Sequence, residues 1–221
     1  MIISRIDTVI VVGFLILVQG TGALAGFWLP AIAPEVGESL GLSPSLIAYP
    51  VLILYIFAMI SSLMAGGFVA RFGAWRASQA ALILIGISHL IFMNGSLMFL
   101  AVGSIILGGA YGLLTPPASH LLSKIVTAKN RNLIFSIRFT GVPLGGILAG
   151  LLAPSVALEY GWRESMLVTV VISAVIAVAM QPLRKRWDSD RSKVAKIIRN
   201  PISDICLVWK LSALKWVALS L

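Results

Sequence analysis

Charge is the scarcest property of this sequence. Only 11% of its 221 residues are Asp, Glu, Lys or Arg, whereas soluble proteins carry about 25% charged residues. Hydrophobic residues make up 59% of the chain, and the mean hydropathy is +1.00. A soluble core does not need this much apolar material, so the composition predicts an integral membrane protein. The net charge of +9 is then interpreted as loop topology and not as nucleic-acid binding.

Cysteine and catalytic constellations are equally scarce. The single cysteine, Cys206, has no partner for an internal disulfide. The sequence contains no His-Glu-x-x-His motif and no acidic residue within a predicted span, and both absences argue against a membrane-embedded enzyme. We therefore expect no enzymatic activity, no cofactor and no bound metal.

Long runs without charge define the predicted helices. The first run, Thr8 to Pro34, spans 27 residues, which exceeds the roughly 7–15 residues of a secretory signal core and is long enough to cross a bilayer. The run from Ala77 to Ser123 suits two spans, divided at Asn94-Gly95-Ser96. In chain order, the predicted spans are 8–34, about 45–70, 77–92, 97–123, 133–158 and 165–183.

The predicted organisation is all-α, with three parts. Residues 1–183 form a domain of six transmembrane helices, residues 184–215 a basic cytoplasmic connector, and residues 216–221 an apolar stretch that resembles the start of a seventh helix. Six residues are too few to cross a bilayer. We therefore expect that the chain is a fragment whose second half is missing.

The distribution of basic residues sets the predicted orientation. If the N-terminus lies inside, 16 of the 17 Lys and Arg residues lie inside too, and only Arg163 lies outside. Four of the eight acidic residues also lie outside: Glu35, Glu38, Glu159 and Glu164. Because inner loops of membrane proteins are enriched in Lys and Arg, we expect a multi-pass protein of the bacterial inner membrane with its N-terminus inside.

The short stretch from Gly66 to Arg76 separates the second and third spans. Its Gly66, Arg71, Gly73 and Arg76 resemble the loop between helices 2 and 3 of the major facilitator superfamily (MFS) of secondary transporters, Gly-x-x-x-Asp-Arg-x-Gly-x-[Arg/Lys]. Arg76 stands one place late, and Ala70 replaces the family's Asp. A plain positively charged turn would fit the same residues. The resemblance implies that these four residues form a cytoplasmic gating loop.

Other features agree with this resemblance. Gly161-Trp162-Arg163 precedes the sixth span, where the family often has such a sequence. Gly26-x-x-x-Pro30 in the first span is echoed by Gly112-x-x-x-Pro116 in the fourth, which are equivalent helices in the family's two inverted three-helix repeats. The resemblance thus implies the N-terminal six-helix half of a transporter and the start of the second half.

Small residues recur four apart in several spans. Such spacing puts them on one helix face and lets a neighbouring helix approach closely. The contacts could be static, or they could slide during alternating access. The residues concerned are Gly22, Gly26, Gly108, Gly112, Gly141, Pro143, Gly145, Gly146 and Gly150.

Polar residues inside the spans are the candidate substrate ligands. Arg138 could grip an anion through bidentate bonds, or it could extend to the head groups at the membrane surface. Gln19 could bind substrate or bridge two helices, and Tyr55 and Tyr111 could bind substrate or serve as packed aromatics. Thr115 is the remaining candidate. The resemblance implies that helices 1, 2, 4 and 5 face the central cavity.

The function expected from these observations is secondary active transport of a small solute by alternating access. The Arg138 side chain and the absence of acidic residues from the spans favour an organic anion as the solute. The alternative is a non-transporting or half-size membrane subunit that must pair with a second half. The expected partners are a small-molecule substrate, the lipid bilayer and the missing C-terminal half, with no nucleic acid.

Overall fold

The computed structural model describes residues 5–192, 194 and 195, and these residues form helices joined by short turns. The expected all-α membrane fold is confirmed. The elements in chain order are α1 (Arg5–Ala31), α2 (Ala33–Leu40), η1 (Pro44–Ile47), α3 (Ala48–Phe72), α4 (Ala74–Phe92), α5 (Leu97–Gly112), α6 (Thr115–Ile125), α7 (Arg131–Phe139), α8 (Gly141–Tyr160), α9 (Trp162–Ala179), η2 (Gln181–Leu183) and α10 (Arg184–Trp187).

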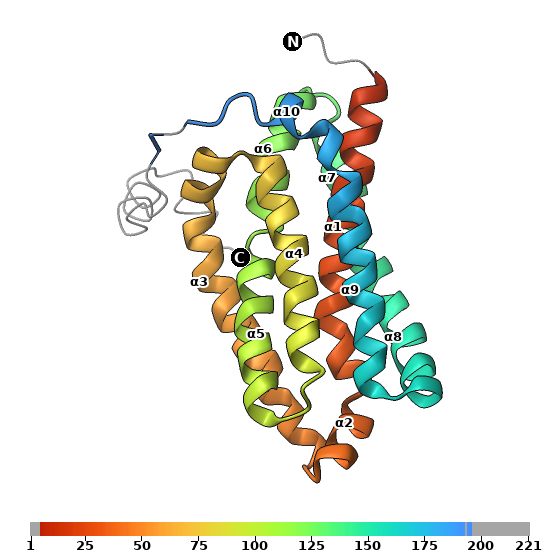
Figure 1. Cartoon of the computed structure of the whole chain (residues 1–221). Coiled ribbons are helices and arrows are strands. Elements are labelled where there is room, and N and C mark those ends of the chain that lie inside the picture. Colours follow the sequence, from red (N-terminus) through yellow and green to blue (C-terminus); the bar gives the residue numbers. More distant parts are fainter. Residues whose placement is uncertain (1–4, 193, 196–221) are drawn as a thin grey trace, which may run out of the picture.

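Six membrane spans run side by side in one bundle (Figure 1). Helices α1, α3 and α4 each form one span, while α5 with α6, α7 with α8, and α9 with α10 form the other three. The N-terminal end of α1, the α3–α4 turn, α7 and α10 lie at one end of the bundle, and α2 lies at the opposite end. We call the first the basic end, because it carries all the described Lys and Arg residues except Arg138 and Arg163.

The first span begins earlier than the charge-free run predicts. Helix α1 starts at Arg5, so Asp7 lies in its first turn, and the expectation of spans without acidic residues is wrong at this position. The Asp7 side chain is mostly buried, and its Oδ2 accepts a hydrogen bond of 2.6 Å from Nη2 of Arg186. The opposite charge on α10 makes the carboxylate tolerable at this depth.

Proline interrupts the fourth and fifth spans. Pro116 and Pro117 cannot donate a backbone hydrogen bond, and their rings exclude a helical carbonyl four residues earlier. The fourth span therefore stops at Gly112 and resumes at Thr115. Pro143 has the same effect on the fifth span, which breaks at Thr140 between α7 and α8. The sequence predicted each of these spans as one continuous helix.

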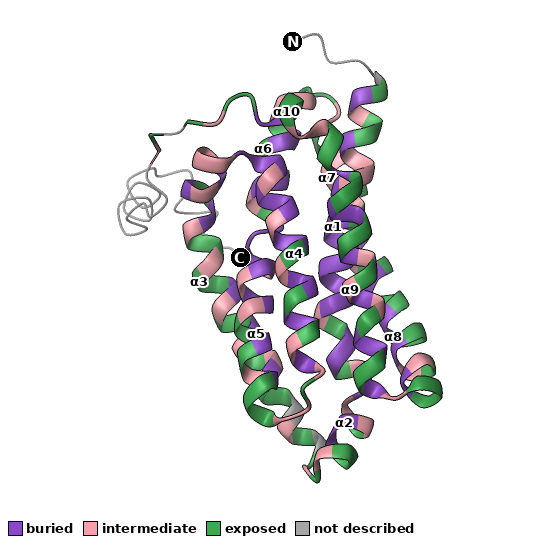
Figure 2. Cartoon of the chain, viewed as in Figure 1, coloured by how far each residue is buried: buried purple, intermediate pink, exposed green. Residues whose placement is uncertain are grey.

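The core lies where α1 and α4 meet their neighbours. Helix α1 packs along α8, α3 packs along α5, and α4 lies between α5 and α9. Figure 2 shows that one face of α3 and one face of α8 remain exposed, and these faces carry large apolar residues such as Tyr55, Ile56, Leu148 and Leu151. Apolar residues facing outward suit a chain with apolar surroundings.

Two glycines allow α8 to approach α1 closely. A Cβ atom on Gly145 would lie 2.8 Å from the backbone N of Leu24 and 2.9 Å from Cβ of Ala23. One on Gly141 would lie 3.1 Å from the backbone N of Gly20. Such separations are shorter than normal contacts, so the two backbones can pack this closely only because side chains are absent here.

A buried carboxylate anchors the start of α4. Gly73 adopts a φ of 97°, which ends α3 and redirects the chain into α4. The Asp188 side chain accepts hydrogen bonds from the backbone N–H groups of Trp75 (2.8 Å) and Arg76 (3.2 Å). These N–H groups lack partners within the helix. Asp188, just after α10, therefore connects the end of the last span to the beginning of the third.

The connector is described only in its first residues. Arg184 to Trp187 form α10, whereas residues 193 and 196–221 lie outside the described part of the chain. The predicted start of a seventh helix at 216–221 falls among them. The division into residues 1–183, 184–215 and 216–221 therefore remains a prediction.

We predict that Gly145→Ala destabilises the protein, whereas Gly150→Ala does not. The added methyl at Gly145 would collide with α1, at a cost of about 1–3 kcal/mol. A Cβ on Gly150 would meet no atom within 4 Å, and alanine is the better helix former. Thermal unfolding in detergent measures both. Equal melting midpoints for the two variants would contradict the close approach of α1 and α8.

Asp188 also predicts a pH dependence. Burial raises the pKa of Asp188 to about 6 from its ordinary 3.8. A carboxyl group whose pKa is higher in the folded state than in the unfolded state stabilises the fold when the pH is below the unfolded-state pKa. This stabilisation is lost as the pH rises through the folded-state pKa. We expect the melting midpoint to fall for this reason between about pH 4 and pH 7, and Asp188→Asn to flatten the profile in that window.

Asp190→Asn is the matched control, because the contribution of Asp190 to stability should depend on pH with the opposite sign. Partial burial alone would raise its pKa, but hydrogen bonds from Lys124 (2.7 Å) and His120 (2.8 Å) hold the pKa of Asp190 below its ordinary value. Its contribution is present at neutral pH and lost in acid, so this variant should be less stable at neutral pH. Identical slopes for the wild type and Asp188→Asn would refute the role given to burial.

Candidate functional site

Arg138 is a buried cation in the interior of the bundle. It lies in the last turn of α7, and its side chain is only 1% exposed. The guanidinium carbon lies 4.7 Å from the centroid of the neighbouring Phe139 ring, within the range of a cation–π contact. The side chain is therefore enclosed among the helices of the bundle.

Two other spans supply the polar groups around Arg138. Its Nη2 donates a hydrogen bond of 2.6 Å to Oε1 of Gln19 on α1, and lies 3.5 Å from the carbonyl oxygen of Leu114. Leu114 lies in the break between α5 and α6. The site thus joins the first, fourth and fifth spans, and the helix break supplies one of its acceptors. Broken helices form substrate sites in many transporters.

The guanidinium group is left with hydrogen-bonding capacity. Its Nε and Nη1 atoms are buried and have no partner among the described residues. No carboxylate of the described residues forms an ion pair with Arg138. An uncompensated buried charge costs several kcal/mol, and Nε and Nη1 each keep an N–H donor for a charge-assisted hydrogen bond. The arrangement can therefore accept an anionic group.

Gly22 positions the helix break against α1. A Cβ at this residue would overlap Cδ1 of Leu114, so the absence of a side chain lets the break lie beside α1. Gly22 is three residues after Gln19, which places the two on nearby faces of α1. The glycine that was predicted as a packing residue thus contributes to the shape of the Arg138 site.

The remaining substrate candidates form a second group. The rings of Tyr55 on α3 and Tyr111 on α5 meet edge to face, with centroids 6.1 Å apart. Tyr55 is 51% exposed, and a Cβ on Gly26 of α1 would lie 3.3 Å from the Tyr111 ring. Thr115 is exposed at the start of α6, directly after Leu114. The structure gives no contact between the tyrosine pair and Arg138.

The stretch predicted as a gating loop is almost entirely helical. Gly66 and Arg71 lie in α3 and Arg76 lies in α4, so only Gly73 is left between the helices. Nη1 of Arg71 donates to the carbonyl of Ala195 at 3.1 Å, and Nε of Arg76 lies 3.7 Å from Oδ2 of Asp188. The stretch is therefore held by residues that follow the last span.

The other predicted packing glycines differ in their surroundings. A Cβ on Gly108 would lie 2.8 Å from Cβ of Phe57, and one on Gly112 would lie 2.7 Å from Cβ of Ser61, so both face α3 closely. Gly146 would make only an ordinary contact with Phe27. Gly150 and Gly66 face open space. Pro143 lies in the first turn of α8, where it contributes to the break after α7.

Sequence reasoning missed two groups that shape these sites. The Leu114 carbonyl is a backbone acceptor, and the Pro116-Pro117 pair was the signal that could have located it, because prolines end the preceding helix. Asp188 carried no local signal, because its partners lie 112 and 113 residues away in the chain.

Known proteins match this chain over part of their length. It is 28% identical to a gallate transporter of Pseudomonas putida over 167 residues, which make up 73% of this chain and 34% of that protein. A crystal structure of the peptide transporter POT in complex with sulfate superposes with a TM-score of 0.66 at 20% identity, over 96% of this chain and 45% of that one. A second POT family transporter gives a TM-score of 0.63 at 18% identity, over 80% and 38%.

The likeness to the solved structures, at these low identities, concerns the fold. The chain spans about a third of the gallate transporter and less than half of the peptide transporters. The family assignment depends on the sequence itself. Residues 13–220, which are nearly the whole chain, match the sequence profile of the Major Facilitator Superfamily. The chain therefore belongs to this family of transporters.

Proposed function

We propose that this chain forms one half of a secondary transporter that moves a small organic anion by alternating access, with Arg138 as a substrate ligand. The observation that supports this most is the buried guanidinium of Arg138, whose Nε and Nη1 have no partner among the described residues. Because the chain belongs to a transporter family, we expect it to move a solute and not to catalyse a reaction.

An anionic substrate would complete the Arg138 site. Gln19 already holds one guanidinium nitrogen at 2.6 Å, which fixes the orientation of the fork. A carboxylate would then supply both the missing acceptors and the missing negative charge. The gallate transporter among the relatives carries, by its name, an aromatic carboxylate. This agrees with the class of solute that the site favours.

A second helical half would complete the transporter. The chain covers only 34% of the gallate transporter and 45% of a peptide transporter. The exposed apolar faces of α3 and α8 are the surfaces on which a second half would pack (Figure 2). A half-size subunit that pairs with a second half would use the same two faces.

We further propose that the basic end of the bundle faces the cytoplasm. Lys and Arg gather there, and Arg163 lies at the opposite end, as the positive-inside rule requires. In this proposal, the N-terminus of α1 and the α3–α4 turn would lie inside, and the membrane would be the bacterial inner membrane. The turn, with Gly66, Arg71, Gly73 and Arg76, would then gate the cytoplasmic side.

We predict that Arg138→Gln strongly reduces anion uptake by the full-length protein in proteoliposomes. Loss of a buried charge-assisted contact costs about 2 kcal/mol or more, which corresponds to roughly a 30-fold or larger decrease in uptake. The substrate panel should contain gallate and other aromatic and aliphatic carboxylates beside their neutral amides. Arg138→Lys keeps the charge but loses the fork, and an intermediate rate is expected.

Arg131→Gln is the matched control, because it removes an exposed arginine from the same helix. It should leave uptake unchanged. Reconstituted amounts must be equal for all variants. Carboxylate uptake that survives Arg138→Gln at the wild-type rate would show that Arg138 is not a substrate ligand.

A further inference from the structure

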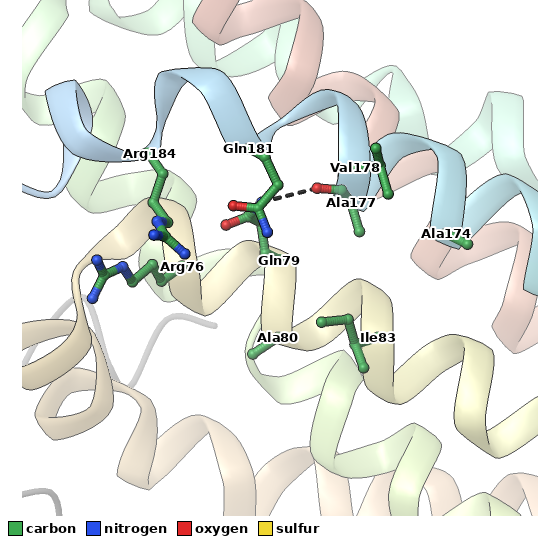
Figure 3. Close-up of a pocket in the computed structure, with 9 residues that line it drawn as sticks. All are labelled: Arg76, Gln79, Ala80, Ile83, Ala174, Ala177, Val178, Gln181 and Arg184. Carbon is green, nitrogen blue, oxygen red and sulfur yellow. Dashed lines mark hydrogen bonds between the residues drawn. The ribbon is translucent and has the colours of Figure 1, made fainter.

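A groove runs between α4 and α9 near the basic end (Figure 3). Its volume is about 420 Å³. Ala80 and Ile83 of α4 line one wall, and Ala174 and Val178 of α9 line the other. The small alanine side chains leave room between two helices that otherwise pack directly against each other.

Apart from Gln79 and Gln181, the side chains along the walls of the groove are apolar, and the groove is open to the surroundings of the bundle. Ile83 is 55% exposed and Val178 is 70% exposed. The polar side chain of Gln79 is held back, because its Nε2 donates a hydrogen bond of 2.8 Å to the Ala177 carbonyl (dashed in Figure 3). In a transmembrane span, such a surface faces hydrocarbon chains.

Arginine side chains stand at the end of the groove nearest the basic end. Figure 3 shows Arg76 of α4 and Arg184 of α10 together there. The same two arginines also line an adjoining polar cavity of about 290 Å³, together with Lys185 and Arg191. We call this polar cavity the basic cup. The groove and the basic cup are connected, because they share Arg76 and Arg184.

The basic cup has an excess of positive charge. Four cationic side chains line it, and the carboxylate that faces them is Asp188, whose oxygens already accept hydrogen bonds from the start of α4. Nε of Arg76 is buried without a hydrogen-bond partner, 3.7 Å from the Asp188 carboxylate. An additional anion in the cup would be attracted by the free charge and would find donors available.

We propose that the groove and the basic cup together bind one anionic phospholipid. Its phosphate would lie between Arg76 and Arg184, and one acyl chain would run along Ile83 and Val178. A free phosphate would use only the cup and would leave the apolar groove unexplained. The continuity of an apolar groove with a cationic cup at the end of a span therefore favours a lipid as the occupant.

Native mass spectrometry of the full-length protein in detergent tests this proposal with phosphatidylglycerol as the probe. We expect one tightly retained phosphatidylglycerol, no comparable retention of phosphatidylcholine, and no displacement by glycerol 3-phosphate at the same concentration. Arg184→Gln should lower the occupancy by about five- to tenfold, because each such charge near a lipid surface contributes a comparable factor. Arg131→Gln, which removes an exposed arginine elsewhere at the basic end, should not.

Ala174→Leu provides a second, independent variant, because it fills the groove without changing any charge. It should also lower phosphatidylglycerol occupancy, whereas Val175→Leu, whose exposed side chain does not line the groove, should not. Wild-type occupancy in both Arg184→Gln and Ala174→Leu would overturn the proposal. Equal binding of glycerol 3-phosphate and phosphatidylglycerol would also overturn it, because the site would then recognise the phosphate alone.

Discussion

The close contact between α1 and α8 is the constraint on which the Arg138 site depends. Arg138 is three residues before Gly141, and Gly141 packs on the backbone of α1 beside Gln19 and Gly20. A side chain at Gly141 or Gly145 would push the fifth span away from the first and would separate Arg138 from Gln19. The absence of two side chains thus brings a cation and an amide together inside an apolar bundle.

The helix breaks supply a backbone acceptor to the Arg138 site. In a bilayer, a backbone carbonyl released from a helix must find another donor. The break before Pro116 leaves the Leu114 carbonyl 3.5 Å from Arg138, and Gly22 makes room for Leu114 against α1. The second break, at Thr140, directly follows the helix that carries Arg138. Both interruptions therefore border the same cation, so the irregular backbone and the polar site are parts of one arrangement.

Much of the fold could be predicted from the sequence, because membrane spans are marked by composition. Six spans, their order and the turn at Asn94–Ser96 follow from charge-free runs and turn residues, and the predicted helix ends lie within a few residues of the observed ones. Asp7 is an exception. Its partner Arg186 lies 179 residues away, and a local pattern of charge contains no information about such a contact.

The candidate site could be predicted only in part. Arg138 and Gln19 could be recognised from the sequence, because polar groups within spans are costly and therefore rare. Their pairing, the Leu114 acceptor and the Asp188 cap depend on how helices face one another, which a single sequence does not specify. The groove between α4 and α9 was also missed, because alanines on two helices leave a cavity only when the helices are placed side by side.

The most direct test of the central claim is Gln19→Glu, a nearly isosteric change that places a carboxylate beside Arg138. If Arg138 is a buried cation that binds an anionic substrate, the new carboxylate should neutralise it and raise the thermal midpoint. The carboxylate should also sharply reduce carboxylate uptake, because it competes with the substrate for Arg138. The melting midpoint and the uptake rate should be measured on the same preparation. An unchanged or lower midpoint together with normal uptake would contradict the claim that Arg138 binds the substrate.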